Sequence, residues 1–148
     1  MAYGSVFTIG YQERTVEEFI GRLKSHNIAV IIDVREMPVS RKRGFSKGRL
    51  SEILQQNDIA YVHIKELGSP KHLRDELHQS NDYESFFVGY RSYIDSRKEI
   101  VDELYRDFIS RETTCLMCME RLPEYCHRTI VAEKIKEIDG NGLVIKHI

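Results

Sequence analysis

The run IAVIIDV at residues 28–34 constrains the fold more than any other part of this 148-residue sequence. Its almost unbroken apolar and β-branched side chains are typical of a strand that is covered on both faces. Strands of that kind occur in parallel sheets that carry helices on either side. Shorter apolar runs predict the remaining strands of a sheet of about five, at residues 5–10, 59–64, 113–119 and 143–148.

The segments between these runs carry apolar residues at helical spacing. Thr15 and Glu18 have the spacing of a capping box and predict the start of the first helix. Ser46 is placed to cap a second helix, and further helices are predicted at residues 71–79, 82–109 (one long or two abutting) and 127–138. Because strands alternate with helices, we expect a single α/β domain over residues 1–148. It would have three layers, with a central, mainly parallel, Rossmann-like sheet flanked by helices.

Composition limits the classes of protein to which the chain can belong. Hydrophobic residues make up 41% of the sequence and charged residues 30%, as in a globular protein. No apolar run approaches the roughly 20 residues that span a bilayer, and the N-terminal stretch does not resemble a signal peptide. We therefore expect a cytoplasmic protein without a membrane partner, whose three cysteines are thiols. The net charge of −1 gives no whole-chain argument for nucleic-acid binding.

Four polar clusters fall where predicted strands end. Ligands of open α/β sheets bind beyond the carboxyl ends of the strands, so we expect these clusters to share one site. The fourth strand ends at Cys118 and Glu120. The candidate ligand-binding residues at the ends of the other three strands are Gly10, Tyr11, Asp33, Arg35 and His63.

The stretch CLMCMERLPEYCHRT at residues 115–129 has the residue types of a zinc site. Residues three apart in a strand point to opposite faces of the sheet, so Cys115 and Cys118 are not expected to share an ion. A second CxxC pair is also missing from the sequence. We predict neither a metal site nor another cofactor.

A reactive thiol is the second interpretation of this stretch. Cys126 precedes the last predicted helix, whose N-terminal amides, together with Arg128, would lower the pKa of the thiol. The same features would bind a phosphate, which makes Arg128 a candidate ligand-binding residue. Glu120 or His127 would carry the proton, and Cys118 completes the candidate catalytic set. In the structural alternative, Cys118 and Cys126 are small buried apolar residues. His127 is then a surface histidine, and Arg128 pairs with Glu124.

A basic loop follows the second strand. Phe45 interrupts its cations, and an aromatic ring among cations is typical of contact with nucleic-acid bases. Arg41 is a candidate ligand for a phosphate in this loop. The alternative interpretation, of equal weight, is that these charges belong to an ordinary solvated surface. The cations of the loop are Arg41, Lys42, Arg43, Lys47 and Arg49.

Taken in order, these motifs resemble the bacterial and archaeal "domain of unknown function" family numbered 488. The family pattern is TIG, DVR, PxSR with an aromatic, YxH, LG and CxExxPxxCHR. The matching segments here are Thr8-Ile9-Gly10, Asp33-Val34-Arg35, Pro38-Val39-Ser40-Arg41 with Phe45, Tyr61-Val62-His63, Leu67-Gly68 and residues 118–128.

The resemblance covers nearly the whole chain and adds Ser40 to the candidate ligand-binding residues. It implies no established reaction. This chain departs from the family at two places: relatives usually carry His-Ser where it has Tyr11-Gln12, and a second Gly where it has Ser69.

The sequence leads to one functional prediction and two alternatives. We expect a phosphate-bearing ligand, a nucleotide or nucleic acid, at the C-terminal edge of the sheet. If the protein is an enzyme, its chemistry would depend on Cys126 as nucleophile or redox thiol. The first alternative is a non-catalytic nucleic-acid-binding module that uses the 41–49 loop. The second is a thiol redox or metal-binding protein.

Overall fold

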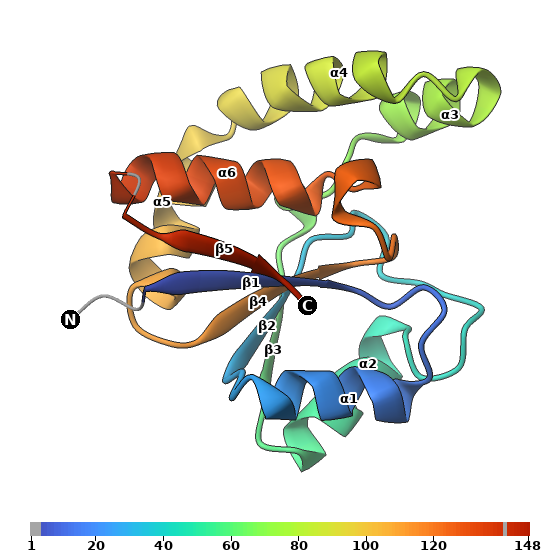
Figure 1. The fold of residues 1–148 in the computed structure, drawn as a ribbon. Helices are drawn as coiled ribbons and strands as arrows, with labels where there is room; N and C mark the ends of the chain where they lie inside the picture. The colour runs from blue at the N-terminus through green and yellow to red at the C-terminus, as the bar shows by residue number, and fades with distance from the viewer. Residues whose placement is uncertain (1–3, 141) are drawn as a thin grey trace.

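A computed structural model describes residues 4–140 and 142–148. Its centre is a sheet of five parallel strands in the order β3-β2-β4-β1-β5 (Figure 1). All five predicted strands are confirmed, the first with its predicted bounds and the other four with slightly shorter ones. They are β1 (Ser5–Gly10), β2 (Val30–Asp33), β3 (Ala60–His63), β4 (Thr114–Cys118) and β5 (Val144–His147).

Helices cover both faces of the sheet, which confirms the three-layer α/β architecture (Figure 1). The helices α1 (Val16–Ser25) and α2 (Lys47–Gln56) lie on one face. The other face carries α3 (Lys71–Ser80), α4 (Tyr83–Asp95), α5 (Lys98–Leu104) and α6 (Arg128–Asp139). Two short 3₁₀ helices are η1 (Lys65–Leu67) and η3 (Pro123–Tyr125). A short π-helix, η2 (Tyr105–Ile109), follows α5. Within the described ranges, none of these helices is long and apolar enough to cross a bilayer.

Several local predictions are confirmed in detail. The Thr15 hydroxyl accepts from the amide of Glu18, and the Glu18 carboxylate accepts from the amide of Thr15, which is the capping box expected for α1. The segment predicted as one or two helices is two, because the chain turns between α4 and α5. Helix α6 ends at Gly140, whose φ of +84° is a left-handed conformation that glycine adopts without strain.

Ser46 precedes α2 as expected, but its side chain does not cap the helix. Instead, the Ser46 hydroxyl accepts from the Ser40 amide at 2.9 Å and donates to the Ser40 carbonyl at 3.0 Å. The predicted helix start is therefore right, while the hydroxyl closes the preceding loop.

Strand β4 divides the apolar side chains between the two cores. Cys115 and Met117 belong to the cluster beneath α1 and α2, whereas Leu116 and Cys118 belong to the cluster beneath α6. This alternation confirms that Cys115 and Cys118 lie on opposite faces of the sheet.

The strand order also creates a place for a ligand. Gly10 of β1 pairs with Cys118 of β4, and Asp33 of β2 pairs with Met117 of β4. After β1 the chain crosses to β2, whereas after β4 it crosses in the opposite direction to β5. From the carboxyl ends of the adjacent strands β1 and β4 the chain therefore leaves for opposite faces of the sheet, to α1 and to α6 (Figure 1). Crevices at such points bind ligands in open α/β sheets.

Candidate functional site

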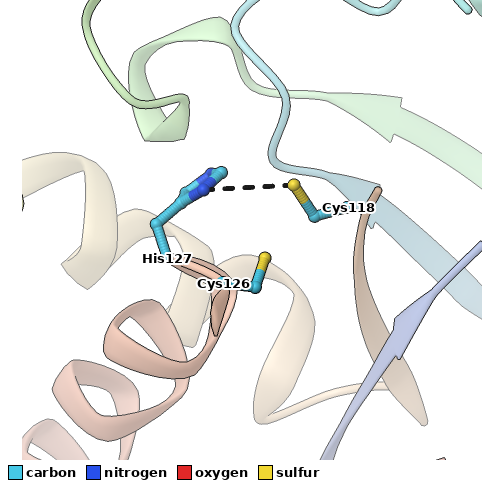
Figure 2. A group of neighbouring side chains, drawn as sticks. All are labelled: Cys118, Cys126 and His127. Carbon is cyan, nitrogen blue, oxygen red and sulfur yellow. Dashed lines mark hydrogen bonds between the residues drawn. The ribbon is translucent and has the colours of Figure 1, made fainter. Parts of the chain in front are cut away.

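Two cysteines and a histidine meet at this crevice. Cys118 ends β4, and Cys126 and His127 precede α6. Their sulfur and ring nitrogen atoms all lie within 4.8 Å of one another, and all three side chains are buried. Figure 2 shows the His127 ring directed toward Cys118, with 3.9 Å between Nδ1 and Sγ.

The start of α6 is arranged around the sulfur of Cys126. The backbone N–H of Arg128 donates to Cys126 Sγ at 3.5 Å, and the N–H of Thr129 donates to the Cys126 carbonyl at 3.2 Å. Amides at a helix N-terminus favour a negative charge. At the start of α6, one of these amides is therefore hydrogen-bonded to the sulfur of Cys126.

His127 is held in one orientation by the neighbouring strand. Its Nε2 lies 2.8 Å from the carbonyl oxygen of Val34. Because a carbonyl only accepts, Nε2 carries a hydrogen, and Nδ1 is the nitrogen that faces the sulfurs. Burial lowers the pKa of His127, but the hydrogen bond to Cys126 and the Cys126 charge outweigh burial and raise it, so the protonated ring donates from Nδ1 to the Cys126 thiolate. The residue after β2 thus fixes the ring orientation of a histidine before α6.

The two thiols are shifted in opposite directions. Burial raises the pKa of Cys126, but hydrogen bonds from Cys118 and His127 and the charges of His127 and Arg128 outweigh it and bring the pKa well below its usual value. The hydrogen bond to Cys126 and burial raise the pKa of Cys118. Burial and the charge of Cys126 raise the pKa of Glu120, whose Oε2 lies 3.6 Å from Cys118 Sγ, to about 7. The lowered pKa of Cys126 has the direction expected from its position before a helix.

Arg128 lies beneath this cluster. Its side chain is 1% exposed, and its guanidinium donates to the backbone carbonyls of Glu120 and Arg121. In the described ranges it has no carboxylate partner, and its Nε has no hydrogen-bond partner. A buried cation without an acid beside it favours a nearby anion, and the Arg128 charge contributes to the lowered pKa of Cys126. The arginine braces the 119–121 loop and is not part of the cleft lining.

Asp33 and Arg35 form a buried ion pair. Arg35 donates through Nε and Nη2 to the two oxygens of Asp33 at 2.9 and 2.7 Å, and Tyr61 donates its hydroxyl to Asp33 Oδ2 at 2.5 Å. Nη1 of Arg35 donates to the Phe45 carbonyl at 2.7 Å. The pair therefore ties the 36–46 loop to the end of β2.

Phe45 gives a correction. Its ring is fully buried, stacks on Tyr11 at 4.5 Å between centroids and packs edge-on against Phe19. The expected contact of this ring with nucleic-acid bases is therefore wrong, because the ring is part of the core beneath α1. The lysines and arginines of this loop therefore have no exposed Phe45 ring beside them, and that ring was the reason for expecting nucleic acid.

The other predicted ligand-binding residues lie outside the cleft. His63 holds the Arg35 carbonyl through Nε2 at 2.7 Å, Ser40 pairs with Ser46, and Arg41 is exposed on the surface loop. Gly10 lies against the 119–121 loop so closely that a Cβ there would be 1.7 Å from the Glu120 carbonyl oxygen. These positions shape the site's surroundings, and a ligand role for them stays a prediction.

A cleft of about 430 Å³ opens over the cluster. Cys118, Glu120 and His127 line it, together with Tyr11 and Arg35, whereas Cys126 does not. These five are the predicted site residues that line the cleft.

Sequence reasoning missed the rim of this cleft. Of seven large apolar side chains that are exposed in the described residues, five line it: Met37, Val39, Met119, Leu122 and Tyr125. The signal was available as apolar residues within two polar loops, but the sequence does not show that the loops face each other. Helix α3 contributes Arg74 and His78, and Arg74 pairs with Glu36 at 2.9 Å.

The same cluster has the donors of a soft metal site. Two thiolates and an imidazole suit zinc or another thiophilic ion. The sequence argument excluded a site shared by Cys115 and Cys118, and that exclusion holds for this geometry, but Cys126 and His127 supply other donors. A metal bound there would involve Cys118, Cys126 and His127.

Comparisons with known proteins bear on the family alone. No curated protein and no solved structure matches the chain. The family model described as "Domain of unknown function DUF488" matches residues 15–135, from the N-cap of α1 into α6. The match includes the whole cysteine and histidine cluster. The chain therefore belongs to the DUF488 family, as its motifs suggested.

Proposed function

We propose that the protein is a thiol-dependent enzyme that acts on a small ligand in the cleft. The observation that carries this proposal is the meeting of two sulfurs and a histidine nitrogen within 4.8 Å at the cleft wall. Thiolate chemistry needs a sulfur, a base and a stabilising positive environment. Cys126, His127 and the start of α6 provide these from one short segment.

The two cysteines take different roles in this proposal. Cys118 is the sulfur that a ligand meets, because it lines the cleft. Cys126 is the thiolate beside it and accepts the Cys118 proton when Cys118 reacts. Glu120, with its pKa near 7, is placed to give a proton to a leaving group.

The ligand is a small molecule that carries an anionic group, of which a phosphate-bearing nucleotide is one example. A cleft of about 430 Å³ has the size of a small-molecule site. Arg35 and Arg74 give it cationic groups, while the apolar rim suits a flat or apolar part of the ligand. Both arginines already have acidic partners, so their attraction for an anionic ligand is moderate.

Alkylation tests the proposal most directly. The rate of iodoacetamide modification of each cysteine, followed by mass spectrometry between pH 5 and 10, should show an inflection for the 118/126 pair at a lower pH than for a free thiol. Cys115→Ser is the matched control, because Cys115 is buried on the other face and burial raises its pKa. Modification of the pair no faster than a free thiol of pKa about 8.5 would overturn the proposal.

Two further measurements separate the remaining possibilities. An anionic nucleotide that binds in the cleft should slow alkylation of Cys118, and no protection by any of a panel would count against that ligand class. Elemental analysis of the purified protein comes first. Stoichiometric zinc that blocks alkylation would assign the cluster to metal binding instead.

A further inference from the structure

We propose that Cys118 and Cys126 form a dithiol–disulfide pair that exchanges with low-molecular-weight disulfides, with Cys118 attacking and Cys126 resolving. This inference rests on the proposed function, since it uses the same cluster, and it names the substrate class. The two neighbouring sulfurs differ in their access to the cleft, and the inference depends on this difference. The sulfur of Cys118 lines the cleft, whereas Cys126, in contact with the same cluster, does not line it.

Proximity selects this pair of cysteines. The two sulfurs lie within 4.8 Å, and a disulfide requires them to approach to about 2.05 Å. Cys118 is the last residue of β4 and Cys126 follows the short η3 turn, so both lie at the ends of elements. Backbone at element ends moves more easily than backbone inside them. Cys115 lies in the opposite core and cannot compete.

Access decides the order of the two steps. Cys118 is 4% exposed and lines the cleft, whereas Cys126 is 1% exposed and does not. A disulfide that enters the cleft therefore meets the sulfur of Cys118 first. The mixed disulfide on Cys118 then lies beside Cys126, within reach of a second attack.

The exchange balances without another reactant. Cys118 sulfur attacks one sulfur of the disulfide RSSR, its proton passes to the Cys126 thiolate, and the first RS group leaves as RSH with the proton from His127 Nδ1. Cys126 then gives that proton to His127 Nδ1 and attacks Cys118 Sγ, and the second RS group leaves with the proton as RSH. Two electrons pass from the protein dithiol to the substrate, and the protein retains the Cys118–Cys126 disulfide.

The cleft favours one kind of disulfide. The exposed side chains of Met37, Val39 and Leu122 at its rim suit an apolar or aromatic substituent next to the sulfur. The guanidinium groups of Arg35 and Arg74 in the lining favour an anionic one, with their acidic partners offsetting part of their charge. We therefore expect an aromatic carboxylate disulfide to react faster than an aliphatic cationic one of similar size.

The experiment uses 5,5′-dithiobis(2-nitrobenzoate) and cystamine as probes, with each rate divided by that of N-acetylcysteine with the same probe. The normalised rate should be larger for the aromatic dianion. In Cys126→Ser the mixed disulfide on Cys118 should persist at least about ten times longer than in the wild type, because the intramolecular attack is lost. Cys115→Ser should behave as the wild type, and Cys118→Ser should form no adduct in the cleft.

Peptide mapping of the treated wild type gives an independent readout that needs no variant. A Cys118–Cys126 disulfide with release of two thiols supports the inference. A mixed disulfide as persistent in the wild type as in Cys126→Ser overturns it, even if the cysteines alkylate rapidly, and so leaves the proposed function standing. Cysteines that react with neither alkylating agent nor disulfide faster than a free thiol overturn both.

Discussion

Replacing Asp33 with asparagine should be among the most destabilising conservative changes in the chain. Its carboxylate is fully buried and accepts from Arg35 N, Nε and Nη2 and from the Tyr61 hydroxyl. Asparagine keeps the shape but turns one acceptor oxygen into an NH₂ group that faces donors. The Arg35 charge, with only 6% of the side chain exposed, is then uncompensated.

Breaking a buried ion pair by removing one partner costs about 3–5 kcal/mol. Domains of this kind have a total stability of about 5–15 kcal/mol, so Asp33→Asn should lower the unfolding midpoint by about 10–15 °C. Urea unfolding followed by far-ultraviolet circular dichroism measures the free energy at pH 7. Asp75→Asn is the matched control: its carboxylate pairs with Lys71 on the surface, and we expect no measurable change.

The double variant Asp33→Leu with Arg35→Met tests the cause. It should lose much less stability than the sum of the single variants, because no charge is left buried. A loss of less than about 1 kcal/mol for Asp33→Asn would refute the reasoning, since the ion pair would then not hold the end of β2 to the 36–46 loop.

Three further predictions concern the loop over the cluster. Glu120 has a folded pKa of about 7, above its unfolded value, so its contribution to stability falls as pH rises from about 4.5 to 7. Glu120→Gln should therefore gain stability relative to the wild type across that window, by at most about 3 kcal/mol, in urea unfolding at pH 5 and pH 8. An equal difference at both pH values would contradict it. Gly10→Ala should lower the free energy of unfolding by at least about 1–3 kcal/mol, because its Cβ would overlap the Glu120 carbonyl. Gly21→Ala, in open space on α1, is the control and should leave that free energy unchanged or raise it. Arg128→Gln should raise the pKa of Cys126, seen as a shift of its alkylation profile to higher pH, and an unshifted profile would show that the arginine is purely structural.

The sequence determined much of the fold, because secondary structure follows from patterns among close neighbours along the chain. The β-branched run 28–34 marked the buried strand β2, and the Thr15/Glu18 spacing marked the start of α1. The period of two in a strand was enough to separate Cys115 from Cys118. The alternation of strands and helices then implied that polar residues at strand ends would share one edge of the sheet.

Only the tertiary structure decided what each polar side chain does at that edge. Arg35 and Arg128 were equally good candidates for anion ligands in the sequence, but Arg35 pairs with Asp33 and Arg128 donates to backbone carbonyls. Phe45 read as an exposed aromatic among cations and is buried on Tyr11.

The cysteine pair and its cleft depend on tertiary contacts in the same way. Cys126 becomes a neighbour of Cys118 only when the start of α6 folds back over the end of β4. The apolar rim forms only when the loops after β2 and β4 face one cleft. Local spacing fixes which face of an element a residue occupies. Whether a charge is satisfied or a thiol is paired depends on groups from distant parts of the chain, and these are brought together by burial of the two cores.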